Sequence, residues 1–195
     1  MILKWKGLLS EKNSFPKNNI PINSVQFLNS KSKIKPYIAV IPILIFIIAI
    51  IFFKRNFIDE FYLNIKGMLI GAILIIPFMI IHEFLHALCL PQKCIAEIFF
   101  SPAGISIIPC SPISKLNYLI TLLIPFFILG LIPLLIWTFT ISFNNVILSS
   151  IIFIVSIANL GACSNDLYNF IEALLKMPKN SFMITSGIKC YYYEA

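Results

Sequence analysis

Apolar runs of membrane-spanning length are the feature that most constrains this chain of 195 residues. A helix needs roughly 20 predominantly apolar residues to cross the hydrocarbon core of a bilayer. Runs that approach or exceed this length lie at 37–53, 67–90, 116–140 and 146–163. We therefore predict a mainly α membrane protein with about four transmembrane helices and the lipid bilayer as its first partner.

The composition supports this class of protein. Apolar residues make up 59% of the chain and charged residues only 12%. The formal net charge is +7, but the excess lies almost wholly before the first apolar run, which is typical of a cytoplasmic anchor. We therefore expect no nucleic-acid partner. The five cysteines show no C-x-x-C spacing and predict no disulfide framework.

The distribution of lysine and arginine predicts the orientation of the chain. Seven of these residues lie in 1–36, two in 91–115 and three in 164–195, which puts twelve on one side of the membrane. The other side has only Lys54, Arg55 and Lys66. The positive-inside rule then predicts a multi-pass protein of the cell membrane with both termini in the cytosol.

Two segments differ in polarity and suggest the domain organisation. Residues 1–36 are polar and rich in lysine, and Pro16 and Pro21 interrupt any long helix there. We predict a cytoplasmic N-terminal arm for this segment. The chain is short enough for one domain, so residues 37–195 are predicted to form a single membrane-embedded domain. The sequence shows no internal repeat, which argues against an inverted-repeat transporter.

A short β-hairpin is expected after the second apolar run. Ala96–Phe100 and Ile105–Ile108 are rich in β-branched and aromatic residues, which favour strands. Ser101–Gly104 separates them, with proline and glycine where a type I turn favours these residues.

The C-terminal tail repeats this chemistry. Phe182–Thr185 and Ile188–Tyr193 flank the dipeptide Ser186-Gly187, which predicts a β-rich tail. Before it, Leu167–Met177 reads as a short helix that stops ahead of Pro178.

A possible metal site lies within the second apolar run. The chain has two histidines, His82 and His86, and they enclose Glu83 in the sequence His-Glu-Phe-Leu-His. Residues i and i+4 share one face of a helix, so both imidazoles can reach one metal ion. Glu83 lies next to that face and can hold a water on the metal, as in the zinc-peptidase signature H-E-x-x-H. Ionisable groups in a membrane helix are costly and usually functional, so we predict bound Zn²⁺.

The third zinc ligand is less directly indicated. Catalytic zinc takes three protein ligands and keeps one position open for water. Because no histidine remains, Asp166 is the first candidate: it follows the fourth apolar run at the depth of the motif, although it could instead cap the next helix. Glu97, in the hairpin, is the alternative, and Glu172 is less favoured. Asn159 could either hydrogen bond between helices or orient substrate or water.

The motif, the hairpin after it, the segment Ser164–Phe170 with its late aspartate, and Lys176–Asn180 before a β-rich tail resemble a known family. This family consists of short bacterial membrane proteins described as zincin peptidases. The chain is also similar, more distantly, to the site-2 protease group of intramembrane metalloproteases. In that group the third zinc ligand is an aspartate that follows an asparagine, and Asn159 and Asp166 could match this pair. The leucine before and the glycine after that aspartate are missing here.

These features favour a zinc-dependent, membrane-embedded endopeptidase that cleaves membrane or membrane-proximal peptides with a metal-activated water. Glu83 is the predicted catalytic base, and a peptide or membrane protein is the predicted substrate. The alternative is a catalytically silent metal-binding membrane protein that acts as a regulatory or structural partner. Cys89 or Cys163 as a fourth ligand would favour this alternative, because structural zinc sites are closed.

Overall fold

The computed structural model describes residues 1–9, 14–29, 35–58, 63–101, 104–139 and 145–194. Within it the chain divides into two compact units. The helical unit comprises Ile34–His82 and Pro125–Asn165, and the mixed unit comprises Met1–Lys33, Glu83–Ile124 and Asp166–Ala195.

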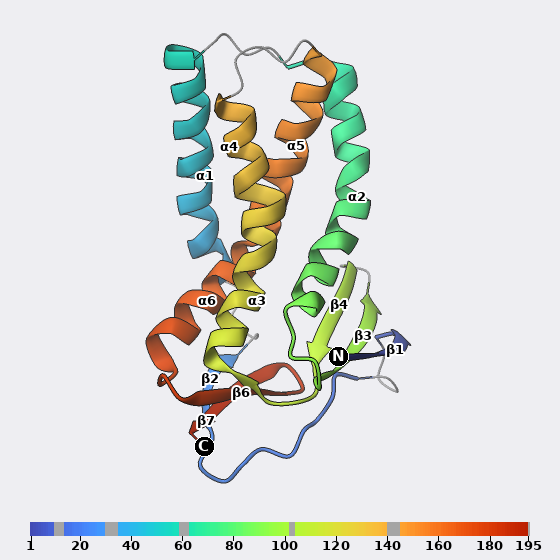
Figure 1. Cartoon of the computed structure of the whole chain (residues 1–195), viewed down its shortest axis with the longest axis vertical. Helices are drawn as coiled ribbons and strands as arrows, with labels where there is room; N and C mark the ends of the chain where they lie inside the picture. Colours follow the sequence, from blue (N-terminus) through green and yellow to red (C-terminus); the bar gives the residue numbers. More distant parts are fainter. Residues whose placement is uncertain (10–13, 30–34, 59–62, 102–103, 140–144, 195) are drawn as a thin grey trace. The chain divides into compact units, whose positions relative to one another are not determined.

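The helical unit consists of long apolar helices, drawn in Figure 1. Its elements are α1 (Lys35–Phe53), the π-helix η1 (Lys54–Ile58), most of α2 (Ile65–Leu88), the π-helix η2 (Phe126–Leu131), α4 (Ile132–Phe139) and α5 (Val146–Ala162). Proline lies inside α1 and α2, where neighbouring helices can satisfy the backbone groups that it frees.

Three described helical stretches are long and apolar enough to cross a membrane: Ile38–Ile58, Ile65–Leu88 and Lys115–Phe139. A fourth is obtained if α5 and α6 (Ser164–Lys176), which are bent by 43° relative to each other, count as one span. The prediction of a mainly helical chain with several apolar spans is therefore confirmed. Helix α1 ends at Phe53, the predicted end of the first span, and the π-helix η1 continues the helical stretch through Ile58.

Lys54, the first residue of η1, is buried. From the sequence this lysine was expected on the side of the membrane opposite the termini, and the residue is only 4% exposed. Its Nζ donates hydrogen bonds to the carbonyl oxygens of Trp137 at 3.0 Å and Thr138 at 3.3 Å, in the last turn of α4. A cation is stabilised by the partial negative charge at a helix C-terminus, which offsets part of the cost of burial.

The interior of the helical unit is closely packed around Trp137. The Trp137 ring lies 4.6 Å from that of Phe153, and its Nε1 donates to Ser149 Oγ at 2.9 Å. Glycine allows two helices to approach at Gly67, where an added Cβ would lie 2.5 Å from the Ile147 carbonyl oxygen. Small residues are favoured at such helix contacts because they let the backbones come close.

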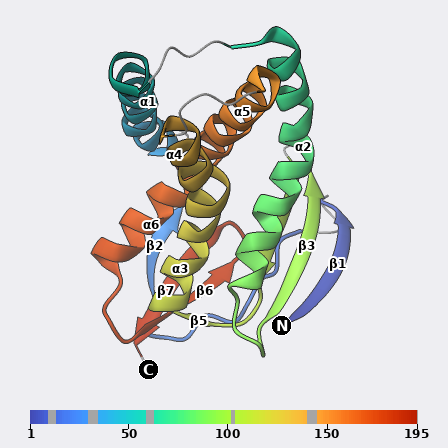
Figure 2. The same cartoon turned by 45° about the horizontal axis from the view of Figure 1, so that its top comes forward.

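A three-stranded sheet forms one part of the mixed unit, and its strands β1 and β3 are seen side by side in Figure 2. Strand β3 (Ile95–Ser101) lies between β1 (Ile2–Leu8), which is parallel to it, and β4 (Gly104–Pro109), which is antiparallel. The predicted hairpin is thus confirmed. Its turn residues Pro102 and Ala103 lie outside the described residues, and Gly104 has φ +124°.

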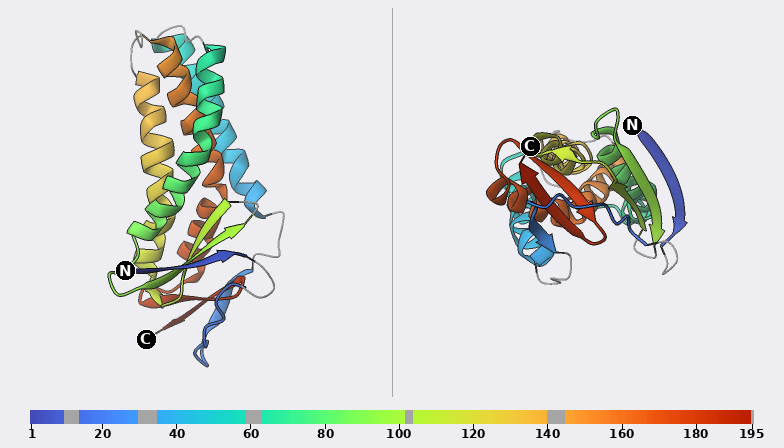
Figure 3. Two further views of the ribbon diagram at one scale, coloured as in Figure 1. Left: turned by 90° about the vertical axis from the view of Figure 1, so that its right-hand side faces the viewer. Right: turned by 90° about the horizontal axis from the view of Figure 1, so that it is seen from below.

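A second, antiparallel sheet has the order β2-β7-β6-β5, and its red strands β6 and β7 are drawn from two sides in Figure 3. The strands are β2 (Val25–Asn29), β5 (Ile113–Ser114), β6 (Ser181–Ser186) and β7 (Lys189–Glu194). The predicted tail hairpin is confirmed, with Gly187 in its turn at φ +62°. Strands β1 and β2 were not predicted, because they pair with residues far along the chain.

Helices α3 (Lys115–Pro125) and α6 share an apolar core with the second sheet. Phe27 of β2 packs edge-on against Tyr118 of α3, with ring centroids 6.3 Å apart. Lys115 Nζ donates to the Leu174 carbonyl at 3.0 Å, which ties the start of α3 to the end of α6. The buried core residues are Phe27, Leu28, Leu90, Cys94, Ala96, Ile113, Tyr118, Leu122, Ala173, Met177 and Met183.

Candidate metal centre

The two histidines lie in the last two turns of α2, which is continuous from Ile65 to Leu88. Because the spacing of four residues is close to one helical turn, His82 and His86 lie on one face of this helix. His82 is buried, and the side chain of His86 is 13% exposed. The predicted span 67–90 is two residues too long at its C-terminal end, but the position of the motif within a helix is as predicted.

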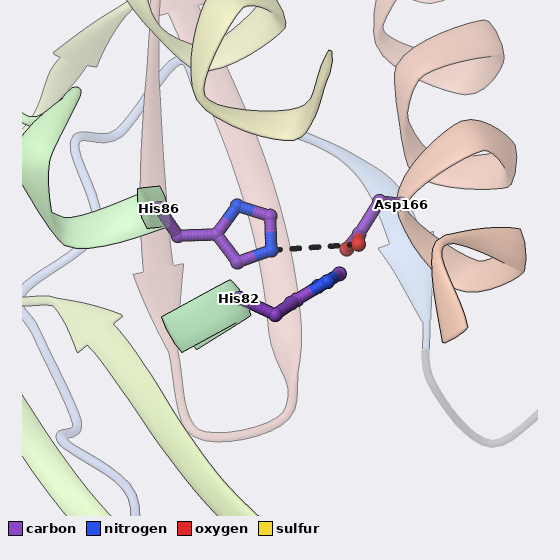
Figure 4. Close-up of side chains that lie close together, drawn as sticks. All are labelled: His82, His86 and Asp166. Atoms are coloured by element: carbon purple, nitrogen blue, oxygen red, sulfur yellow. Dashed lines mark ion pairs between the residues drawn. The ribbon is translucent and has the colours of Figure 1, made fainter. Parts of the chain in front are cut away.

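Asp166 lies beside these imidazoles. Its Oδ2 is 3.4 Å from His86 Nε2. Ligand-type atoms of His82, His86 and Asp166 all lie within 4.8 Å of one another. Figure 4 shows both rings directed toward the Asp166 carboxylate. Helix α6 begins at Ser164, three residues earlier than predicted, so Asp166 lies inside its first turn rather than at the capping position before it.

Backbone geometry fixes which nitrogen of His86 faces Asp166. The His86 Nδ1 lies 2.8 Å from the carbonyl oxygen of Thr121 in α3. A carbonyl can only accept a hydrogen bond, so Nδ1 carries a proton, and in the neutral ring Nε2 is then the nitrogen with the lone pair. Metal-binding histidines usually donate their second ring N–H to an oxygen in this way, which orients the ring.

His82 also has a neighbour at Nδ1. The Sγ atom of Cys163, at the end of α5, lies 3.9 Å from this nitrogen, and both groups are buried. Sulfur is a weak hydrogen-bond partner, so this contact holds the ring less firmly than the Thr121 carbonyl holds His86.

Glu83 faces the edge of a strand. Its Oε2 accepts a hydrogen bond of 3.4 Å from the backbone N–H of Ile107 in β4. Since β4 is an edge strand of its sheet, this N–H is on the side of β4 that no other described strand pairs with. A carboxylate next to two imidazoles and next to a free strand edge can act on a peptide held in an extended conformation.

The other acidic candidates have lysine partners. Glu97 in β3 pairs with Lys6 in β1, with 3.1 Å between Oε1 and Nζ. Glu172 pairs with Lys176 one turn later in α6. Asp166 is the acidic residue that the structure groups with the histidines, while its function as a ligand stays a prediction.

Asn159 lies in α5, one turn before Cys163, and is fully buried. Its Nδ2 donates to the Val155 carbonyl at 2.9 Å, and among the described residues its Oδ1 has no hydrogen-bond partner. A buried amide oxygen without a partner is costly, which is compatible with a water or substrate group at this position. Neither of its two predicted roles is tested by this geometry.

The donor set suits zinc. Two imidazole nitrogens and one carboxylate oxygen are the ligands of many catalytic zinc sites, which keep a fourth position open. Within the described part of the chain, no cysteine joins the group of atoms that lie within 4.8 Å of one another. The arrangement therefore fits an open zinc site better than a closed structural one.

The sequence analysis missed Thr121. Its contribution is a backbone carbonyl, and its own hydroxyl donates instead to the Asn117 carbonyl at 2.8 Å. Every residue has a backbone carbonyl, so the residue type alone gives no signal for this contact.

One family of proteins matches this chain. The family model described as "Putative zincin peptidase" covers residues 75–182, which is more than half of the chain and includes the histidine motif, the hairpin and Asp166. A comparison with curated proteins and with solved structures found no match.

Proposed function

The chain belongs to this family of zincin peptidases, and from this premise we propose that it is a zinc-dependent, membrane-embedded endopeptidase. The observation that supports the proposal best is the grouping of His82, His86 and Asp166 within 4.8 Å, with Glu83 adjacent on the same helix. His82, His86 and Asp166 would hold the ion, and Glu83 would be the catalytic base.

The residues divide the work of peptide hydrolysis. Zinc at this site would supply Lewis acidity and lower the pKa of a bound water to about 7. Glu83 would take the proton of the attacking water and deliver it to the leaving amine. The Thr121 carbonyl would keep the His86 ring in one orientation throughout. Asn159, with its free amide oxygen, is the candidate for orienting substrate or water.

The edge of β4 is the proposed place for the substrate. A peptide bond within a helix is blocked, so the substrate must be extended where it is cut. An extended peptide can pair with an exposed strand edge through main-chain hydrogen bonds. At the β4 edge, the N–H of Ile107 already reaches Glu83, so a peptide paired there would bring a carbonyl close to the base.

Strand pairing also supports four membrane crossings. Strand β1, near the N-terminus, pairs with β3 in the segment after α2, and β2 pairs with β7 near the C-terminus. Paired strands must lie on the same side of a bilayer. The chain therefore crosses the bilayer an even number of times between β1 and β3, and again an even number of times between β2 and β7. We infer that α5, with or without α6, is the fourth crossing. The lysine and arginine distribution then puts this side in the cytosol of the cell.

A second candidate function is a silent metal-binding protein that serves as a regulatory or structural partner. The proximity of Cys163 Sγ to His82 Nδ1, at 3.9 Å, is the observation that would favour it, since a fourth protein ligand closes a zinc site. Metal analysis together with a cleavage assay separates the two functions.

The deciding experiment compares three variants of the purified full chain. His82→Ala is expected to lose its zinc, because two ligands remain. Glu83→Gln is expected to keep zinc but to cleave a mixture of fluorogenic peptides in detergent about 10²- to 10⁴-fold more slowly, since an amide cannot accept the proton. Glu172→Gln, which changes a carboxylate paired with Lys176, is the control and should match the wild type.

Two results would contradict the proposal. Equal zinc content in the wild type and in His82→Ala would remove the metal site. Full cleavage by Glu83→Gln would remove the general base. A zinc-loaded wild type that cleaves none of the peptides, and no co-expressed single-span membrane protein, would favour the silent metal-binding function.

A further inference from the structure

The Thr121 carbonyl that contacts His86 is in an unusual position within its helix. In an α-helix the carbonyl of residue i accepts the N–H of residue i+4. For Thr121 that residue is Pro125, the last residue of α3, and proline has no N–H. The carbonyl is therefore left without its helical partner by the sequence itself.

The helix nevertheless continues past this point. Pro125 has φ −63° and ψ −37°, and the π-helix η2 follows it directly. The helical backbone thus continues although this one hydrogen bond is missing. Thr121 and Pro125 are both buried, and a buried carbonyl without a partner is costly. The His86 Nδ1–H, 2.8 Å away, supplies the partner that position 125 withholds.

We propose that Pro125 is a positioning residue for the metal centre. By withholding an N–H from Thr121, it leaves that carbonyl for His86 Nδ1–H, so that in the neutral ring Nε2, on the side of Asp166, has its lone pair for a metal. The inference rests on the proposed zinc site for its purpose. Its structural content, the proton on His86 Nδ1, can be measured in the metal-free protein as well.

The competing explanation is that Pro125 only shapes the helix. Proline kinks helices through its ring as well as through its missing N–H. Pro133, in α4, is a matched control because it removes one N–H from the same apolar stretch about two turns later. Alanine at either position restores an N–H and removes a ring, but only position 125 lies four residues after Thr121.

The experiment uses two readouts on the full-length protein. Zinc affinity is measured by competition with a chelator. The His86 tautomer is measured by ¹⁵N NMR of the imidazoles in metal-free protein, at a pH where both rings are neutral. The chain has only two histidines, so the spectrum is simple, and His82→Gln assigns it.

Pro125→Ala is expected to lower zinc affinity about 10-fold and to shift His86 from the Nδ1–H tautomer toward a mixture. Removing a group that hydrogen-bonds a metal ligand usually lowers metal affinity about 10- to 100-fold. We expect the low end of this range because the Thr121 carbonyl has two lone pairs and can keep part of its bond to His86. Pro133→Ala should leave both readouts unchanged. Lactic acid at position 125, which has neither a ring nor an N–H, should restore wild-type values.

Three results would overturn the inference. If Pro125→Ala has the zinc affinity and the His86 tautomer of the wild type, the hydrogen bond between the Thr121 carbonyl and His86 does not depend on the missing N–H at position 125. Equal effects of Pro125→Ala and Pro133→Ala would assign the effect to helix shape, as would failure of the lactic acid variant to rescue. If Pro125→Ala does not fold, the lactic acid variant alone decides, by keeping or losing the Nδ1–H tautomer. If the wild type binds no zinc, the proposed function fails, and the tautomer measurement still tests the inference.

Discussion

Among the described residues, the helical unit buries a lysine and an asparagine, whereas the buried polar residues of the mixed unit are Thr121, Ser181 and Thr185, which carry hydroxyl groups. In the helical unit large apolar side chains face outward, as Ile73 and Ile76 do with 70% of their surface exposed, while Lys54, Ser150 and Asn159 are buried. The mixed unit has an apolar core between a sheet and two helices. This difference supports the proposal that the helical unit faces lipid and the mixed unit faces water.

The buried polar side chains of the helical unit make their hydrogen bonds within the protein. Four of them donate a hydrogen bond to the carbonyl four residues earlier in their own helix: Thr138, Ser150, Ser156 and Asn159. Such bonds need no water and no partner from another helix. Lys54 likewise uses backbone carbonyls. In the mixed unit, Lys115 also uses a backbone carbonyl, while Lys6 pairs with the Glu97 carboxylate.

Helix α2 belongs to both units along its length. Residues up to His82 are part of the helical unit, and residues from Glu83 onward are part of the mixed unit. The histidine motif therefore begins where the chain passes from one unit to the other.

The largest expected effect is the loss of membrane insertion when an aspartate replaces an exposed isoleucine of the helical unit. The same substitution in the mixed unit tests whether the two units differ in this respect. Ile73→Asp, at an exposed position of the helical unit, should destabilise membrane insertion by about 3 kcal/mol, the cost of an aspartate near the centre of a membrane helix. Ile22→Asp, at a fully exposed position of the mixed unit, should change stability by less than about 0.5 kcal/mol. The measurement is the fraction of protein that resists alkaline extraction from membranes. Equal loss in both variants would break the comparison.

The next effect concerns the acidic residue of the mixed unit that lies nearest the histidines. Asp166→Asn should lower zinc affinity about 100-fold or more, because losing an anionic ligand should cost at least the upper end of the range for outer ligand partners. If Asp166 only favours the start of α6 through its charge in the first turn, the change should leave zinc affinity unchanged and cost about 0.3–1 kcal/mol of stability. Chelator competition measures the affinity. Glu97→Gln, whose carboxylate pairs with Lys6, is the control and should bind zinc normally.

The smallest effect tests whether the mixed unit has a dry core. Burial raises the pKa of the Cys190 thiol from 9.0 to about 11. Between these values the unfolded chain loses this proton and the folded chain keeps it. The contribution to stability is therefore fully present below pH 9 and is lost as the pH rises toward 11.

At pH 10 this loss is on the order of 1 kcal/mol. Urea unfolding at pH 8 and pH 10 should show a larger drop for the wild type than for Cys190→Ala, which has no thiol to titrate. Comparing the two proteins removes the contribution of the tyrosines, which titrate in both. The same drop in both proteins would mean that water reaches this thiol in the folded state.

The sequence determined the features that depend on neighbours along the chain. The apolar runs predicted the helices, and the spacing of four residues put His82 and His86 on one helix face beside Glu83. Alternation of β-branched and aromatic residues around a glycine predicted the hairpin of β6 and β7. These predictions succeed because helix and hairpin periodicities are local and side chains express them directly.

Only the tertiary structure decided which distant segments meet. It paired β1 with β3 and β2 with β7, buried Lys54 against the end of α4, and grouped Asp166, and not Glu97, with the histidines. Such choices depend on the packing of whole elements, to which a single residue adds little. The Thr121 carbonyl shows the limit most clearly: backbone groups are the same at every residue, and the sequence singles this one out only through the missing N–H of Pro125.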